Sequence, residues 1–119
     1  MKQLKMNFKP VSQRLCDDCV RCAVASIFGL DSDQVPHFYR LGVWYVELQK
    51  WINGYGWTNM IESVEDTPVN LQHPDDYYMG NWTTEKAAHA LVMQHGKVVW
   101  NPSGASVKSH HNNLIFLRP

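Results

Sequence analysis

The sequence has no excess of charge of either sign. Its 119 residues include 11 Lys and Arg and 11 Asp and Glu, and no stretch concentrates the basic residues. Nucleic acids and anionic membrane surfaces attract proteins through clustered positive charge. We therefore expect neither nucleic acid nor membrane as a partner.

Long apolar runs are also missing. No stretch approaches the roughly 18 consecutive apolar residues of a membrane span, and the polar residues 1–7 lack the apolar segment of a secretory signal. This pattern predicts a soluble, cytoplasmic protein. Repeats and breaks in composition are absent too, and the length suits one hydrophobic core, so residues 1–119 are predicted to form a single domain.

Cysteine is scarce and confined to one place. Cys16, Cys19 and Cys22 all lie within seven residues. An odd number of cysteines this close together cannot form the long-range disulfide framework of small secreted domains. At least one thiol is therefore expected to stay reduced.

The first half of the chain favours helices. Apolar residues recur at helical spacing after residue 18, and Gly29 can end that helix. A short helix is predicted at residues 32–35, which Pro36 ends or kinks, and a third at about residues 43–53. The first fifteen residues are expected to be an extended lead-in.

Strand-forming residues dominate the second half. β-branched and aromatic residues predict strands at residues 57–64, 88–94, 97–101 and 114–117, with His95-Gly96 as a tight hairpin turn. Residues 65–86 show no clear periodicity. Helices followed by an antiparallel sheet predict an α+β fold.

Cys19 is the sharpest candidate for chemistry, because it falls in the first turn of the best predicted helix. Backbone N–H groups and the helix dipole favour a negative charge there, and a neighbouring imidazolium would lower the pKa of the thiol further. Asp17 and Asp18 would oppose this through like-charge repulsion unless they point outward as caps. We expect Cys19 to be a nucleophile that is ionised at neutral pH.

Three further side chains complete a possible site. Gln13 precedes Cys19 by six residues and could donate to an oxyanion together with the Cys19 backbone N–H. His89 opens one predicted strand and Asn101 closes the next, so an antiparallel hairpin would bring them to the same end. His89 is expected to act as the base, with Asn101 orienting its ring.

The order of these residues resembles that of the papain-like cysteine peptidases. Residues 13–19 (QRLCDDC) are similar to the Gln-to-Cys segment of that superfamily, and residues 18–23 (DCVRCA) look like the bacteriocin-processing peptidases. Short papain-like proteins of phage and bacterial genomes have a pattern similar to residues 19–30, 35–38 and 89–103. The resemblance implies a papain-like fold, with a nucleophile at a helix N-terminus packed on a C-terminal antiparallel sheet.

The same resemblance implies a function. It points to a cysteine hydrolase acting on a peptide or protein, through a Cys19-His89-Asn101 triad with Gln13 as oxyanion donor and without a cofactor. Val20 departs from the pattern, because the larger families usually have Gly after the nucleophile. Asn101 stands where the bacteriocin-processing group has Asp, although papain itself has Asn.

Three alternatives remain open. Deamidation or acyl transfer would use the same residues, since all pass through a thioester. A catalytically weak or inactive binding module would keep the groove and hold a partner with aromatic side chains, namely Trp44, Tyr45, Trp51, Tyr77, Tyr78 and Trp82. Of these, Tyr77, Tyr78 and Trp82 are expected to line or cover the groove.

The cysteine spacing also resembles part of an iron–sulfur binding run, or with His37, His110 or His111 a zinc site. A cluster needs a loop around the metal, whereas Cys22 lies within a helical pattern and no fourth cysteine exists. Metal binding is therefore the least favoured alternative.

Overall fold

The computed structural model describes residues 3–12, 18–63, 67–83, 88–104 and 110–119. The helical elements come first: α1 (Cys19–Phe28), the 3-10 turn η1 (Ser32–Gln34), α2 (Phe38–Leu41) and α3 (Trp44–Asn53). The strands follow: β1 (Thr58–Glu62), β2 (Tyr78–Thr83), β3 (Ala88–Gln94), β4 (Lys97–Trp100) and β5 (Asn112–Leu117). The predicted α+β class is confirmed.

Helix α1 forms where the apolar spacing predicts it. Its residues from Cys22 to Phe28 are all buried, which agrees with a helix at the centre of the core. Gly29 ends the helix in the left-handed conformation at φ 65°, and its N–H donates to the carbonyl of Ala25. A residue without a Cβ adopts this conformation at little cost, so the predicted stop is confirmed.

The five strands form one antiparallel sheet in the order β1-β5-β2-β3-β4. The β3–β4 hairpin turns at His95 (φ 55°) and Gly96 (φ 74°), as predicted. Strand β2 is the correction, because it lies inside the segment predicted to be aperiodic and yet pairs with both β3 and β5. Gly80 and Asn81 lower its strand propensity, and pairing on both sides overrides that preference.

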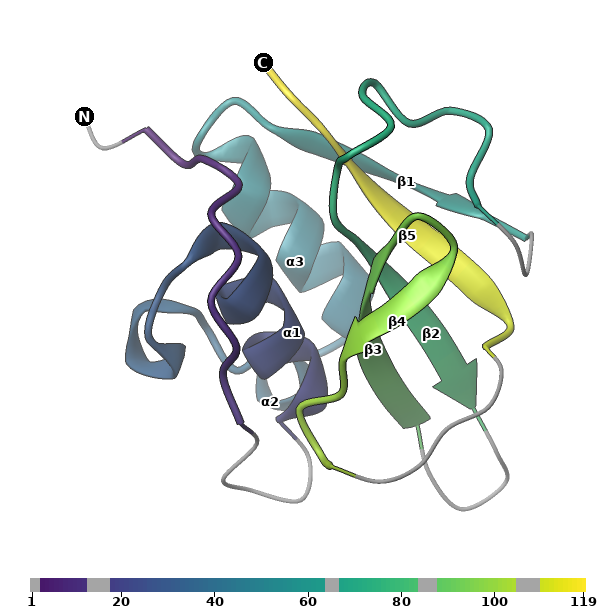
Figure 1. Ribbon diagram of the computed structural model, residues 1–119. Helices are drawn as coiled ribbons and strands as arrows, with labels where there is room; N and C mark the ends of the chain where they lie inside the picture. The colour runs from purple at the N-terminus through teal and green to yellow at the C-terminus, as the bar shows by residue number, and fades with distance from the viewer. Residues whose placement is uncertain (1–2, 13–17, 64–66, 84–87, 105–109) are drawn as a thin grey trace.

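The helices pack on one face of the sheet. Figure 1 shows α1 and α3 beside the strands, with the lead-in running along α1. Ala90 and Val92 of β3 face α1 in the main core, whereas Leu91 and Met93 belong to a smaller cluster with Tyr78 on the other face. Successive residues of β3 therefore face opposite sides of the sheet.

The lead-in is extended along α1, as expected. The N–H of Asn7 donates to the Ile27 carbonyl at 2.9 Å, and the Val11 N–H donates to Ser26 Oγ at 2.9 Å. The indole of Trp100, at the end of β4, donates to the Val11 carbonyl at 2.9 Å. These bonds join the first residues, α1 and the β3–β4 hairpin.

Helix α3 directs its apolar stripe inward. Leu48 and Ile52 are fully buried, and Trp44 and Trp51 are partly buried against the main core. These two tryptophans therefore serve core packing. None of the described helices has the length and hydropathy that crossing a membrane requires.

Candidate active site

Cys19 is the first residue of α1, at the end of the helix that faces the start of β3. Figure 1 shows the N-terminal end of α1 and the start of β3 at the lower end of the molecule, and the chain that leaves β4 runs down toward them. The thiol is in reduced form and only 3% of the residue is exposed. The helix thus places a buried sulfur where three distant segments meet.

Burial decides the charge state of this sulfur. Desolvation raises the pKa of Cys19, and hydrogen bonds from the backbone N–H groups of Ala90, Val20 and Cys19 itself lower it only in part. The charge of Asp18 raises the pKa further. The prediction of a thiolate already formed at neutral pH is therefore wrong in direction, because the cost of burying the charge exceeds the gain from the helix N-terminus.

Asp18 occupies the N-cap position of α1 without capping it. Its side chain makes no capping hydrogen bond, and the residue is 3% exposed. Burial, followed by the charge and hydrogen bond of Asp18, raises the pKa of Cys22 to about 12. Asp18 is thus the like-charge neighbour that the sequence predicted, and it adds to the effect of burial, which is the main cause of the raised pKa of both thiols.

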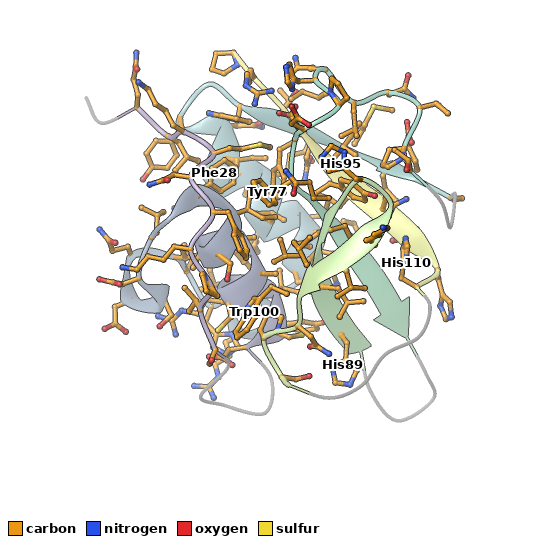
Figure 2. The ribbon with its side chains drawn as sticks, in the orientation of Figure 1. Phe28, Tyr77, His89, His95, Trp100 and His110 are labelled. Carbon is orange, nitrogen blue, oxygen red and sulfur yellow. The ribbon has the colours of Figure 1, made fainter. Side chains whose placement is uncertain are left out.

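His89 lies at the second position of β3, directly before Ala90. Since the Ala90 N–H donates to the sulfur of Cys19, the backbone next to His89 touches the thiol. The Nδ1 atom of His89 is buried. Figure 2 shows His89 at the lower end of the sheet, whereas His95 lies on the turn at the far end of the same hairpin.

Asn101 follows β4 directly and lies at the same end of the hairpin as His89. The register pairs Val92 with Trp100, so the chain reaches Asn101 at the level of Leu91, two residues from His89. The side-chain oxygen of Asn101 accepts hydrogen bonds from the Ser103 N–H at 3.2 Å and from Ser103 Oγ at 2.9 Å. A local turn therefore fixes the orientation of this amide.

One predicted site residue lies outside the described part of the chain, and another residue was missed. Gln13, the predicted oxyanion donor, belongs to residues 13–17, which the structure does not describe. Tyr39 of α2 was not predicted: burial raises the pKa of its hydroxyl, and the charge of Cys19 raises it further. The phenol is therefore close enough to the sulfur to sense its charge, which nothing in the local sequence pattern indicates.

Two of the aromatic residues expected to line or cover the groove, Tyr77 and Tyr78, pack elsewhere. Tyr77 stacks on Phe8 of the lead-in with ring centroids 4.9 Å apart. Tyr78 is fully buried on the sheet face away from the helices, and its hydroxyl accepts a hydrogen bond from the Gly96 N–H at 3.0 Å. The expectation for these two residues is wrong, because both belong to an ordered, packed segment. The ring of Trp82 lies outside the described side chains.

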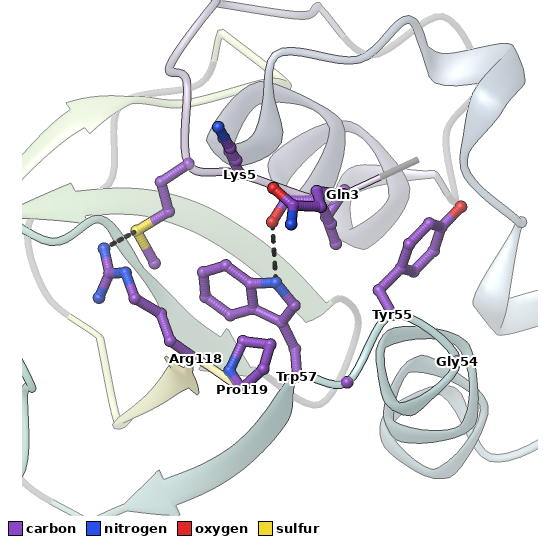
Figure 3. A pocket seen from close by; sticks show the side chains of 10 residues that line it. Gln3, Lys5, Gly54, Tyr55, Trp57, Arg118 and Pro119 are labelled. Atoms are coloured by element: carbon purple, nitrogen blue, oxygen red, sulfur yellow. Dashed lines mark hydrogen bonds between the residues drawn. The ribbon is translucent and has the colours of Figure 1, made fainter. Parts of the chain in front are cut away.

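A cavity lies at the opposite end of α1. It has a volume of about 800 Å³ and is lined by residues of the lead-in, the α3–β1 connection and the last two residues (Figure 3). Trp57 packs there against Phe28, the last residue of α1, and its indole donates to the Leu4 carbonyl at 2.9 Å. Neither Cys19 nor His89 lines this cavity.

Within the described ranges, no three His, Cys, Asp or Glu side chains gather closely enough to hold a metal ion. Cys16, the first residue of the cysteine run, lies outside them. In comparisons with known proteins, no family model, no curated protein and no solved structure matches the chain.

Proposed function

We propose that the protein is a papain-like cysteine hydrolase that cleaves amide or isopeptide bonds. Cys19 attacks the carbonyl carbon, His89 takes the thiol proton and passes it to the leaving amine, and Asn101 positions the imidazole. Gln13 and the Cys19 N–H hold the oxyanion. The observation that carries this proposal is the hydrogen bond from the Ala90 N–H, directly after His89, to a sulfur at the N-terminus of α1.

The raised pKa of Cys19 determines how the reaction begins. A thiol that is protonated at rest cannot attack as a preformed thiolate, so His89 must remove the proton as the carbon–sulfur bond forms. The N–H groups of Ala90 and Val20 donate to the sulfur, and they stabilise the charge that develops on it while the Cys19 N–H serves the oxyanion. The mechanism is thus general-base catalysis from a neutral pair instead of attack by an ion pair.

An activated ester tests the proposal without knowledge of the natural substrate. p-Nitrophenyl acetate should release one equivalent of p-nitrophenol rapidly, and mass spectrometry should find one acetyl group on Cys19. Cys19→Ala should abolish this burst. His89→Ala should slow acetylation by about 10²- to 10⁴-fold, the usual contribution of a general base.

A comparison of His89→Ala with His95→Ala tests whether the loss of acetylation is specific to His89. His95 is exposed on the hairpin turn, with its Nε2 3.1 Å from a carboxylate oxygen of Asp75, so His95→Ala should leave acetylation unchanged. Equal rates in His89→Ala and wild type, or acetylation of sites other than Cys19, would rule out the triad.

The burial of Cys19 favours a second candidate, a papain-like binding module without catalysis. An enclosed thiol with a raised pKa is what an inert structural cysteine shows. In that case Cys19 should react with the ester, and with iodoacetamide, no faster than cysteine in solution. Deamidation or acyl transfer would instead preserve the burst. In acyl transfer an added amine would accept the acyl group, whereas in deamidation water would resolve the thioester.

A further inference from the structure

We propose that Cys19 and Cys22 form a reversible disulfide within the first turn of α1, so that this turn is a site of regulatory oxidation. Both cysteines are in reduced form and buried, at the first and fourth positions of the helix. The regulatory meaning rests on the proposed role of Cys19 as nucleophile, whereas the disulfide itself does not.

Helix geometry brings the two residues to the same face. Residues three apart have Cβ atoms about 5–6 Å apart, and a disulfide requires roughly 3.5–4.5 Å. The first turn must therefore tighten by about 1 Å or slightly more. It can do so because the N–H groups of the first helical residues have no intrahelical acceptors. The bond from the Cys22 N–H to the Asp18 carbonyl, at 3.0 Å, closes the turn that has to tighten.

The surroundings give the two sulfurs different roles. Burial raises the pKa of both thiols, and at Cys19 three backbone N–H groups offset this in part. Cys22 lies one turn deeper, is fully buried and donates from its sulfur to the Ser12 carbonyl at 3.6 Å. The charge of Cys19 also raises the pKa of Cys22, so the two sulfurs are near enough to interact. We therefore expect Cys19 to be oxidised first, and Cys22 then to attack the oxidised Cys19 and form the disulfide.

A peroxide supplies the oxidising equivalents. The small fraction of Cys19 that is deprotonated attacks one oxygen of hydrogen peroxide, the O–O bond breaks, and hydroxide leaves to give a sulfenic acid. The Cys22 sulfur then attacks the Cys19 sulfur, the S–O bond breaks, and water leaves with the proton of the Cys22 thiol. Two electrons pass from the two sulfurs to the peroxide, and a dithiol reverses the change. The disulfide form has no thiol at position 19 and cannot attack a carbonyl.

The sequence provides a clear readout, because Arg21 lies between the two cysteines. Trypsin cleaves after Arg21, so a Cys19–Cys22 disulfide links two separate tryptic peptides, residues 15–21 and 22–40. A Cys16→Ser variant leaves only the two thiols of interest. After hydrogen peroxide, denaturation and alkylation, mass spectrometry should find most of the protein as this linked pair, and dithiothreitol should separate it.

Two controls complete the experiment. Cys22→Ala in the same background should give no linked pair and should instead accumulate sulfinic acid on Cys19, which dithiothreitol does not reverse. Sulfinic acid on Cys19 of the Cys16→Ser protein with Cys22 still reduced, or two unoxidised thiols in excess peroxide, would overturn the inference.

The ester burst separates this inference from the proposed function. In the Cys16→Ser protein, peroxide should abolish the burst and dithiothreitol should restore it. A linked pair in a protein that never shows a burst would refute the hydrolase and leave the oxidation site in place. A burst without a linked pair would do the opposite.

Discussion

The two ends of helix α1 differ in what surrounds them. At the N-terminal end, Cys19 and Asp18 are enclosed, and backbone N–H groups converge on the sulfur. At the C-terminal end, Gly29 stops the helix and Trp57 lies beside a cavity of about 800 Å³. Ten residues of helix, about 15 Å, separate the two ends. The buried thiol and the open volume therefore occupy different places, so we expect substitutions at one end to change the proposed chemistry and substitutions at the other to change stability.

The largest effect on stability is expected at the C-terminal end, from Trp57→Ala. Trp57 is 3% exposed, meets Phe28 edge-on at 5.1 Å, and lies beneath the guanidinium of Arg118 at 5.5 Å. Removing a buried indole costs about 3–5 kcal/mol of unfolding free energy, measurable by urea titration. Tyr55→Ala, which lines the same cavity but is 37% exposed, should cost less than about 1 kcal/mol.

The chemistry at the other end should survive the loss of Trp57. Under conditions where Trp57→Ala is folded, acetylation of Cys19 should proceed at the wild-type rate. A large fall in that rate, with the fold intact by circular dichroism, would mean that the cavity takes part in the reaction and that the two ends are coupled.

Gly29→Ala, also at the C-terminal end of α1, should cause a smaller loss of unfolding free energy than Trp57→Ala. The residue has φ 65°, and a Cβ there would also collide with the backbone oxygen of Asn7. The left-handed conformation alone costs about 1–2 kcal/mol, so unfolding free energy should fall by more than that. Gly104 is the matched control, since it has φ 73° and, apart from its chain neighbours, no atom of the described residues lies within 4 Å of an added Cβ. Equal losses in the two alanine variants would show that the lead-in simply moves away from α1.

At the N-terminal end of α1, the raised pKa of Cys22 should make the stability of the protein depend on pH. Because the folded-state pKa of Cys22 is about 12, the unfolded chain loses this proton at lower pH than the folded protein. Stability is thus fully present below about pH 8.5, the ordinary thiol pKa, and falls above it by up to about 1.4 kcal/mol per pH unit. Urea midpoints should decline more steeply with pH in wild type than in Cys22→Ala. Parallel declines would show that Cys22 is not the group responsible.

How much of this could be predicted from sequence differs between the two halves of the chain. Helix α1 and the His95-Gly96 turn were predictable because each depends on local chemistry, namely apolar spacing, a glycine stop and a turn dipeptide. Strand β2 was not, because Gly80 and Asn81 are poor strand formers and only pairing with β3 and β5 fixes them in the sheet.

Some features of the candidate site could likewise be predicted from the sequence and others could not. The position of Cys19 at a helix N-terminus and the common end of His89 and Asn101 follow from sequence order and hairpin geometry. The direction of the Cys19 pKa does not, because desolvation depends on neighbours from β3 and α2 that are distant in sequence, such as Ala90 and Tyr39. Sequence patterns report the helix dipole but not the burial that opposes it.

The smallest expected effect separates the charge of Asp18 from burial as causes of the raised pKa of Cys19. Asp18→Asn removes a buried negative charge that raises the pKa of both Cys19 and Cys22, and it keeps the size of the side chain. The thiolate fraction of Cys19 should rise, by up to about tenfold for each unit by which its pKa falls, and alkylation by iodoacetamide at neutral pH should accelerate severalfold. Asp33→Asn, an acid on η1 whose side chain is 89% exposed, should leave the rate unchanged. If Asp18→Asn reacts no faster than wild type, desolvation alone keeps the thiol protonated, and only the proton transfer to His89 could then make Cys19 a nucleophile.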